Sequence, residues 1–208
     1  MTRVSIASEG WPFILPACSL VVLCAILQWR AAAGVSLVIA LFITWFFRDP
    51  ARTIPADPQT LVSPADGRVI EILPGSDGGT QISIFLSIFN VHVNRSPVAG
   101  EVIDVTRSPG KFLAAWKHEA SSDNVQASVT VRTPRGDVRF VQITGLIARR
   151  IVCYLTPGAL VARGERYGLI RFGSRVDIFL PPAAEPVVRV GDRVRGGSDV
   201  IARWRTAP

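Results

Sequence analysis

The sequence has few of the residues that build metal sites, disulfide scaffolds or lysine-bound cofactors. Its 208 residues include three cysteines and two histidines, which argues against a Cys/His zinc site and excludes a disulfide-dense secreted domain. We therefore expect no metal, and we interpret Cys18, Cys24 and Cys153 as reduced thiols. Only two of the 23 basic residues are lysines, Lys111 and Lys117.

Acidic residues are also scarce, since the chain has 16 of them against 23 basic residues and a net charge of +7. Hydrophobic residues make up 49% and charged residues 19% of the chain, which excludes disordered and fibrous classes. A basic protein can bind nucleic acid or an anionic membrane surface. The basic residues are scattered and form no RNP, zinc-finger or helix-turn-helix pattern, so we expect no nucleic-acid partner.

Two long uncharged runs lie near the N-terminus. They cover residues 11–29 and 31–47, and Arg30 separates them. As helices they would be about 28 and 26 Å long, close to the roughly 30 Å hydrocarbon core of a bilayer. Trp11 and Trp29 flank the first run, as expected at membrane interfaces. The short link predicts a helical hairpin with both of its ends on one side of the membrane.

The charges around the hairpin predict its orientation. Arg3, Arg48 and Arg52 place both ends in the cytoplasm by the positive-inside rule, so we expect residues 1–50 to be a membrane anchor. Two alternatives stay open. The first run, with the small residues 31–33, has features of a signal peptide. Alternatively, the hairpin only dips into the bilayer, because both runs are short and prolines weaken the first.

Residues 51–208 form the second expected domain, and their pattern is mostly β. Residues 81–89 alternate between apolar and polar side chains, which is typical of a half-buried strand. The rest of the expected elements are a hairpin of residues 128–132 and 138–143, strands at 176–180, 187–190 and 200–204, and one or two helical turns within 111–120. The sequence predicts a mainly β fold: an antiparallel, barrel- or sandwich-like domain of barrel–sandwich-hybrid type behind an N-terminal helical membrane hairpin.

Three short segments of this domain carry chemistry-bearing residues. Residues 63–67 read Ser-Pro-Ala-Asp-Gly, residues 91–97 read Val-His-Val-Asn-Arg-Ser-Pro, and residues 172–174 read Phe-Gly-Ser. Taken singly, each has an ordinary structural interpretation. An Asp-Gly pair is common in turns, and a Gly-Ser pair between strands is typical of a bulge or turn. A lone histidine at the end of a strand is more often packed than catalytic.

In this order, the three segments resemble the proenzymes of phosphatidylserine decarboxylases of the short, membrane-anchored bacterial and archaeal type. That family has the motifs "SPADG", "VHVNR-P" and a "Phe-Gly-Ser" processing site, and its "Phe-Arg-Asp-Pro" segment matches residues 47–50. The resemblance covers nearly the whole chain. It implies a location at the bacterial or archaeal inner membrane, with the catalytic domain on the cytoplasmic side.

The resemblance also implies a self-processing reaction. Ser174 attacks the carbonyl of Gly173, and β-elimination from the resulting ester cuts the chain into a β chain, 1–173, and an α chain, 174–208. Ser174 becomes a pyruvoyl group, which forms an imine with the amine of phosphatidylserine and stabilises the carbanion left by loss of CO2. The product is phosphatidylethanolamine, made in phospholipid biosynthesis. Pyridoxal phosphate is not expected, because the chain has only two lysines and no phosphate-cradling loop.

The matching motif positions imply roles for individual residues. His92 accepts the proton of Ser174, and Asp66 orients His92, following the usual nucleophile, base and orienter arrangement. Long members of the family carry a second histidine where this chain has Arg95, so His92 is expected to serve both self-cleavage and decarboxylation. The only other histidine, His118, is the alternative candidate for these roles.

Substrate binding and assembly are expected as follows. Arg95 and Arg175 are candidates to pair with the anionic groups of phosphatidylserine. The resemblance implies that the α and β chains stay together and that this heterodimer pairs with a second one.

Two other functions stay open. The first is a pyruvoyl decarboxylase of a soluble amino acid. The second is a membrane-tethered, non-catalytic binding module, because residues 190–201 resemble the "GD-V--G" turn of lipoyl carrier domains. Residues 174–208 contain no lysine, and a lipoyl carrier needs one, so we interpret this likeness as a shared type of β fold.

Overall fold

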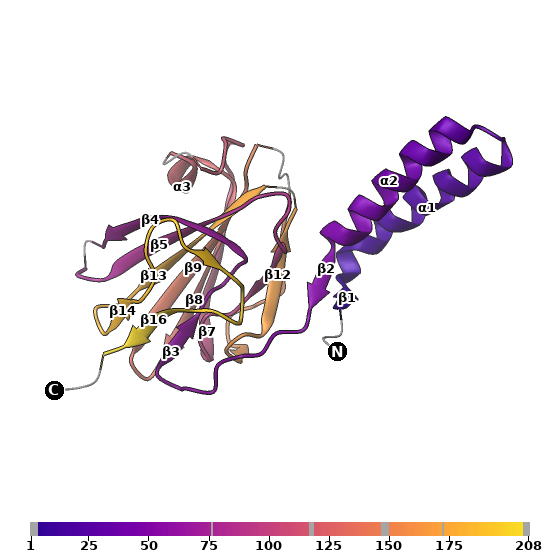
Figure 1. The fold of residues 1–208 in the computed structure, drawn as a ribbon. Helices are drawn as coiled ribbons and strands as arrows, with labels where there is room; N and C mark the ends of the chain where they lie inside the picture. The colour runs from indigo at the N-terminus through magenta and orange to yellow at the C-terminus, as the bar shows by residue number, and fades with distance from the viewer. Residues whose placement is uncertain (1–3, 76, 117–118, 147–149, 172, 206–208) are drawn as a thin grey trace. The chain divides into compact units, whose positions relative to one another are not determined.

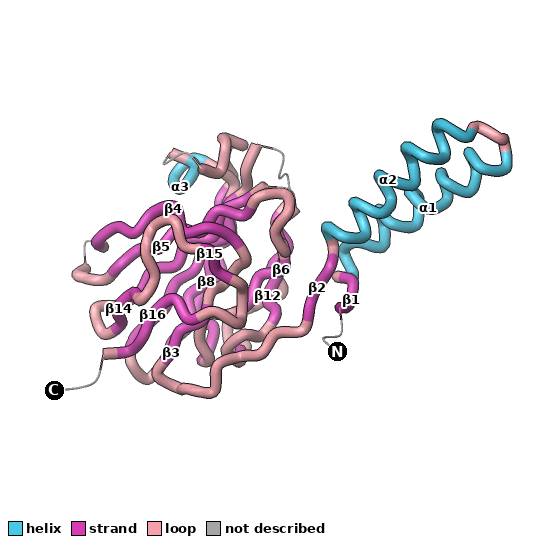
Figure 2. Tube along the Cα trace, in the orientation of Figure 1, coloured by secondary structure: helices cyan, strands magenta, loops and turns pink. Residues whose placement is uncertain are grey.

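The computed structural model describes residues 4–75, 77–116, 119–146, 150–171 and 173–205. The chain divides into two compact units, Met1–Ala51 and Arg52–Pro208 (Figure 1). The first unit is mostly helical and the second mostly β, as the colouring by secondary structure shows (Figure 2). The predicted fold class, a mainly β domain with an N-terminal helical hairpin, is therefore confirmed.

The N-terminal unit is a helical hairpin closed by a short pair of strands. Its elements are β1 (Val4–Ile6), the 3-10 helix η1 (Ser8–Gly10), α1 (Trp11–Ile26), α2 (Arg30–Phe46) and β2 (Arg48–Pro50). The two helices pack side by side (Figure 1). The chain reverses direction between them at Gln28, which has a φ of 58°.

The surface of this hairpin is apolar. Val22, Ile26 and Val38 are 58%, 71% and 66% exposed, and an apolar surface of this extent is unfavourable in water. The segment Ser8–Ile26 is long and apolar enough to cross a bilayer, and Arg30–Phe46 is a shorter apolar helix. These features indicate that the hairpin associates with a membrane.

The second unit is built from antiparallel strands. They are β3 (Thr60–Val62), β4 (Gly67–Pro74), β5 (Thr80–Leu86), β6 (Val93–Arg95), β7 (Gly100–Ser108), β8 (Gln126–Thr133), β9 (Gly136–Ile143), β10 (Ile151–Cys153), β11 (Leu160–Val161), β12 (Arg166–Ile170), β13 (Ser174–Leu180), β14 (Ala184–Pro186), β15 (Arg193–Val194) and β16 (Val200–Trp204), with one helical turn, α3 (Ala120–Asp123). The largest sheet has the order β11-β7-β8-β9-β13-β5-β4-β15 and curls into a half-barrel. Two three-stranded sheets, β10-β12-β6 and β14-β16-β3, complete the domain.

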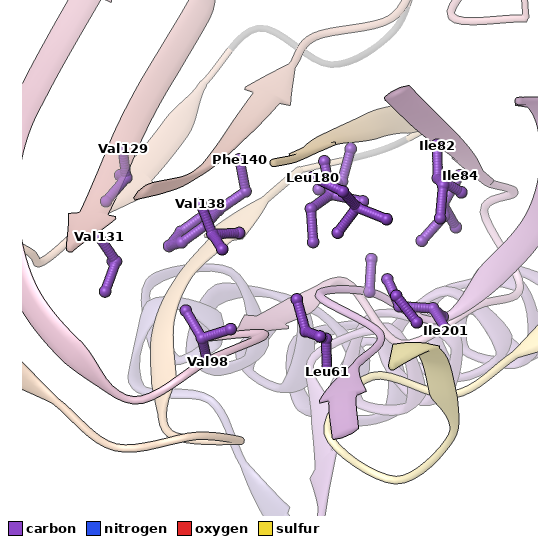
Figure 3. Packing of buried hydrophobic residues seen from close by; sticks show 14 of the residues in the cluster. Leu61, Ile82, Ile84, Val98, Val129, Val131, Val138, Phe140, Leu180 and Ile201 are labelled. Atoms are coloured by element: carbon purple, nitrogen blue, oxygen red, sulfur yellow. The ribbon is translucent and has the colours of Figure 1, made fainter. Parts of the chain in front are cut away.

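The hydrophobic core lies between the large sheet and the two small ones. Leu61 and Ile201, from β3 and β16, face Ile82, Ile84 and Leu180 of the large sheet (Figure 3). Because side chains alternate along a strand, every second residue of a strand in the large sheet points toward this core, and most of these residues are apolar.

The predicted hairpin is confirmed as β8 and β9, joined by a turn at Pro134 and Arg135. The strand expected at 187–190 is wrong: β14 lies earlier and ends at Pro186. Beyond it, the N–H of Val187 bonds to Ile201 O at 2.9 Å, and the chain then turns at Gly191, where φ is 100°. These residues therefore leave the sheet edge to reach β15.

The helical turns expected within residues 111–120 are also largely misplaced, because α3 begins at Ala120. The side chain of Asn124 explains the difference. Its amide group bonds to the backbone N–H and C=O of Leu113 and to the C=O of Thr144, at 2.7 to 2.8 Å. These bonds replace helical ones and hold the segment in an irregular conformation.

A core substitution tests the packing between the sheets. Phe140 of β9 is fully buried and its ring lies 4.8 Å from that of Tyr167 on β12, centroid to centroid. We expect Phe140→Ala to lower the free energy of unfolding by about 3–5 kcal/mol, because it leaves a cavity that the sheets cannot fill. Leu160→Ala is the matched control, since Leu160 is 82% exposed. Equal thermal unfolding of the two variants would contradict this packing.

Candidate active site

The candidate site lies where the chain crosses from a small sheet to the large one. Strand β12 belongs to the small sheet β10-β12-β6, and β13 is an inner strand of the large sheet between β9 and β5. The described residues of the crossing include Gly173, which has a φ of 61°. This left-handed conformation is strained for residues with a Cβ, which explains why glycine occupies the position.

His92 is held at the same crossing. It comes directly before β6, and its backbone carbonyl accepts a 3.3 Å hydrogen bond from the N–H of Ile170 at the end of β12. In the buried ring, Nε2 accepts a 3.3 Å bond from the N–H of Gly173, and Nδ1 lies 3.0 Å from the carbonyl oxygen of Asn90. Both contacts are satisfied by the neutral tautomer that carries its proton on Nδ1. In that tautomer the Nε2 lone pair points to the backbone N–H of Gly173, the residue before Ser174.

Ser174 is the first residue of β13 and pairs with Leu86 of β5. It shares its face of the strand with the core residues Val176 and Ile178. Ser174 is fully buried, and no group in the described part of the chain hydrogen-bonds its Oγ. A buried hydroxyl without a partner is unfavourable, so it is expected mainly where the group has a chemical role.

The carbonyl of Gly173 faces a second glycine. A Cβ added to Gly145 would lie 2.2 Å from Gly173 O and 3.1 Å from the Cβ of Ala115. Any side chain at position 145 would therefore displace the carbonyl that Ser174 is expected to attack. Sequence reasoning did not single out Gly145, because the close approach joins segments that are distant in the sequence.

A buried amide pair lies beside His92 and Ser174. Gln142 Nε2 donates to Asn94 Oδ1 at 2.8 Å, while Asn94 Nδ2 and Gln142 Oε1 have no partner among the described residues. Asn94 is two residues after His92, and Gln142 pairs with Val176, two residues after Ser174. The pair thus forms the next layer inward, and it supplies an unused donor and an unused acceptor close to the site. Asn94 lies within a motif, so a signal for it existed, whereas Gln142 lies in β9, which carries no motif.

Asp66 lies in a turn before β4 and is nearly buried. Arg52 Nη2 contacts both carboxylate oxygens at 2.8 Å, and the N–H of Gly196 donates to one of them at 2.7 Å. The acceptor found at His92 Nδ1 is the carbonyl of Asn90. The role of Asp66 in orienting His92 therefore stays a prediction.

The two arginines expected to bind substrate are both engaged by the protein. Arg95 Nη1 donates to the carbonyl of Gly164 at 3.2 Å. Arg175 is fully buried and donates to Asp177 at 2.6 Å, Glu71 at 2.9 Å and Ser83 at 2.6 Å. The geometry argues against Arg175 as a substrate-binding residue, because these buried partners already occupy its guanidinium group.

Other candidate groups have the following positions. His118 and Phe172 lie outside the described residues. Within the described residues, no group of three or more His, Cys, Asp or Glu side chains is arranged to hold a metal ion.

An apolar pocket of about 250 Å³ reaches Gly173 from the surface. Phe85, Ile88, Trp116 and Leu146 line much of it. Trp116 and Leu146 are exposed at its rim, and the ring of Trp116 packs edge-on against Phe85 at 5.9 Å. The pocket would accept the apolar part of a substrate next to the crossing.

Substitution of the buried Arg175 tests its contribution to the stability of the fold. Arg175→Ala leaves the carboxylate of Asp177, whose side chain is 1% exposed, without its nearest cation. We expect a loss of about 3–5 kcal/mol in the free energy of unfolding, as is usual when one partner of a buried ion pair is removed. Denaturant titration measures it. A variant of unchanged stability whose KM alone rises would instead support the substrate-binding role.

Comparisons with known proteins identify the family of this chain. Residues 39–202 match the family model described as phosphatidylserine decarboxylase. The chain is 48% identical to the phosphatidylserine decarboxylase proenzyme of Symbiobacterium thermophilum over 98% of this chain and 97% of that protein. It is 45% identical to the proenzyme of Geotalea uraniireducens, over 94% and 95%, and 43% identical to that of Pelobacter propionicus, over 95% and 96%. The chain therefore belongs to the phosphatidylserine decarboxylase family and is the proenzyme of a decarboxylase.

Proposed function

We propose that this protein cuts its own chain between Gly173 and Ser174, and then decarboxylates phosphatidylserine with a pyruvoyl group made from Ser174. The observation that carries the proposal is the hydrogen bond from Gly173 N–H to His92 Nε2. It puts an unprotonated ring nitrogen against the backbone of Gly173, one residue before Ser174, whose buried hydroxyl has no partner in the described part of the chain. These residues fit a group that must be made from the chain itself.

Self-cleavage uses only groups of the chain and water. His92 Nε2 takes the hydroxyl proton of Ser174 while Oγ attacks the carbonyl carbon of Gly173. The C–N bond then breaks, and the amine of residue 174 receives that proton, which leaves an ester. Loss of the Cα proton breaks the Cβ–Oγ bond, so Gly173 leaves as a carboxylate and residue 174 becomes dehydroalanine. Addition of water and loss of ammonia give the pyruvoyl terminus.

The pyruvoyl carbonyl supplies the electron sink that lets the amino acid head group lose CO2. The protein's residues bind and protonate the reacting molecule. The apolar pocket beside Gly173 would receive the part of the lipid next to its head group. We propose that His92 also returns a proton to the α-carbon, since its Nε2 accepts the N–H of Gly173, the residue before 174. The product would be phosphatidylethanolamine, made at the cytoplasmic face of the inner membrane for phospholipid biosynthesis.

The two halves would remain together after cleavage. The α chain would contain β13, which pairs with β5 on one side and β9 on the other. Both of these strands belong to the β chain. Separating the halves would therefore remove an inner strand from the large sheet and expose the core residues Val176, Ile178 and Leu180.

Substitution of His92 tests the assignment of the base. His92→Ala is expected to stop self-cleavage, so that the protein stays at 22.5 kDa on a denaturing gel. Asp66→Asn tests the predicted orienting residue in the same assay and is expected to slow cleavage strongly. The amount of each variant recovered from membranes controls for folding. Wild-type cleavage in His92→Ala would contradict the role of His92 as base.

Gly145 supplies a steric test of the same step. Gly145→Ala should displace the Gly173 carbonyl and slow cleavage, by roughly a hundredfold for a shift on the order of 1 Å. Gly34→Ala is the matched control, because a Cβ at Gly34 meets nothing within 4 Å. Circular dichroism checks the fold of both. Cleavage of Gly145→Ala at the control rate would contradict the proposed position of the carbonyl.

The substrate is tested by measuring CO2 release from phosphatidylserine in detergent micelles and from free serine. We expect activity on the lipid and little on the amino acid, because the pocket beside Gly173 is apolar. Higher activity on free serine would favour the decarboxylase of a soluble amino acid. A folded, uncut and inactive protein would favour a binding module.

A further inference from the structure

Two arginines with no acidic partner stand opposite each other near the site. Arg193 of β15 pairs with Arg68 of β4 across the strands, and both side chains are exposed. In the part of the chain that the structure describes, neither guanidinium forms an ion pair or a side-chain hydrogen bond. The carboxylate of neighbouring Asp192 accepts the backbone N–H of Arg189 instead. Like charges directly opposite each other in a sheet are destabilising, so an anion bound between the two arginines would offset their repulsion.

The two arginines line one pocket of about 540 Å³. Its other walls include Phe85, Ser87 and Asn90. Asn90 is the residue whose carbonyl accepts the hydrogen bond of His92 Nδ1. The basic pocket therefore reaches the residue that fixes the tautomer of the proposed catalytic base.

The basic pocket also adjoins the apolar pocket beside Gly173. Phe85 and Ser87 line both. The basic pocket on one side of this shared wall contains two guanidinium groups. The apolar pocket on the other side is lined mostly by apolar side chains, including Trp116 and Leu146. A single molecule that fills both carries an anionic group next to an apolar body. A phospholipid has this arrangement.

We propose that Arg68 and Arg193 bind the phosphodiester of the lipid substrate and thereby place its head group at residue 174. Guanidinium groups suit this task because their planar forks donate paired hydrogen bonds to phosphate oxygens. The role is one that Arg175 cannot fill, since its guanidinium is buried among protein groups. This inference rests on the proposed function, which supplies the phospholipid.

The experiment compares Arg68→Gln and Arg193→Gln with the control Arg132→Gln in the full-length protein. Arg132 is an exposed arginine of β8 that lines neither pocket. Each variant is assayed with a short-chain phosphatidylserine below its critical micelle concentration, and with long-chain phosphatidylserine in phosphatidylcholine vesicles. Self-cleavage and thermal unfolding are recorded in parallel.

We expect each of the two variants to raise KM roughly tenfold for both forms of the substrate, as for the loss of a charge-assisted hydrogen bond. The kcat, self-cleavage and Tm should stay near wild type, and Tm should not fall, because one of two opposed charges is removed. Arg68→Lys should restore part of the loss, since it keeps the charge without the fork. The Arg132→Gln control should be unchanged.

Three results would overturn the inference. In the first, KM is unchanged in both assays. In the second, KM changes only with vesicles, which would mean that the arginines contact the bilayer surface and not the substrate. In the third, self-cleavage or Tm falls sharply, which would mean a structural role. Failure of the wild-type protein itself to release CO2 from phosphatidylserine would count against the proposed function, and is thereby distinguished from these results.

Discussion

The hydrogen bond between the N–H of Gly173 and Nε2 of His92 joins the small sheet to the large one at the point where the chain crosses between them. A bond of this kind adds only about 1 kcal/mol to stability, so its importance is geometric. It requires an unprotonated Nε2, a carbonyl at Nδ1, supplied by Asn90, and a positive φ at Gly173. Together these conditions set the position of the ring against the backbone of Gly173, one residue before Ser174.

Strand β13 holds Ser174 in register because both of its faces are buried. Val176, Ile178 and Leu180 pack into the core, while Arg175 and Asp177 form a buried ion pair on the opposite face. A slip of one residue would move the charged pair into the apolar core and the apolar residues against the carboxylates. The register of the strand is therefore fixed, because one of its faces is apolar and the other carries a buried ion pair. Ser174, the proposed nucleophile at its first position, is therefore held precisely, although its hydroxyl has no hydrogen bond among the described residues.

Local patterns predicted the elements that depend on local chemistry. The alternating residues on either side of Pro134 and Arg135 identified the hairpin of β8 and β9, and the uncharged runs identified α1 and α2. The errors came where side chains from distant segments decide the backbone. Asn124 holds residues near Leu113 out of a helix. After the bond of Val187 to Ile201, the chain leaves β16 and turns at Gly191, so residues 188–190 do not form the expected strand.

The site shows the same division. The motifs located Ser174 and His92, but the acceptor of His92 Nδ1 is a backbone carbonyl, which carries no sequence signal. From the sequence, Arg175 beside Ser174 was a candidate for binding substrate. Only the fold shows that its guanidinium group binds Glu71 and Asp177. Arg68 and Arg193 become neighbours through the pairing of β4 with β15. The contacts between strands that are distant in the sequence were thus the part of the site that could not be predicted from the sequence.

The measurement that tests the central claim most directly is the intact mass of the purified wild-type protein beside Ser174→Ala. The account predicts that the wild type separates under denaturing conditions into residues 1–173 and 174–208, while Ser174→Ala stays whole. The smaller fragment should be lighter, by one ammonia, than a peptide that begins with serine, as a pyruvoyl terminus requires. A wild-type chain that remains whole at 22.5 kDa while folded in the membrane would contradict the account.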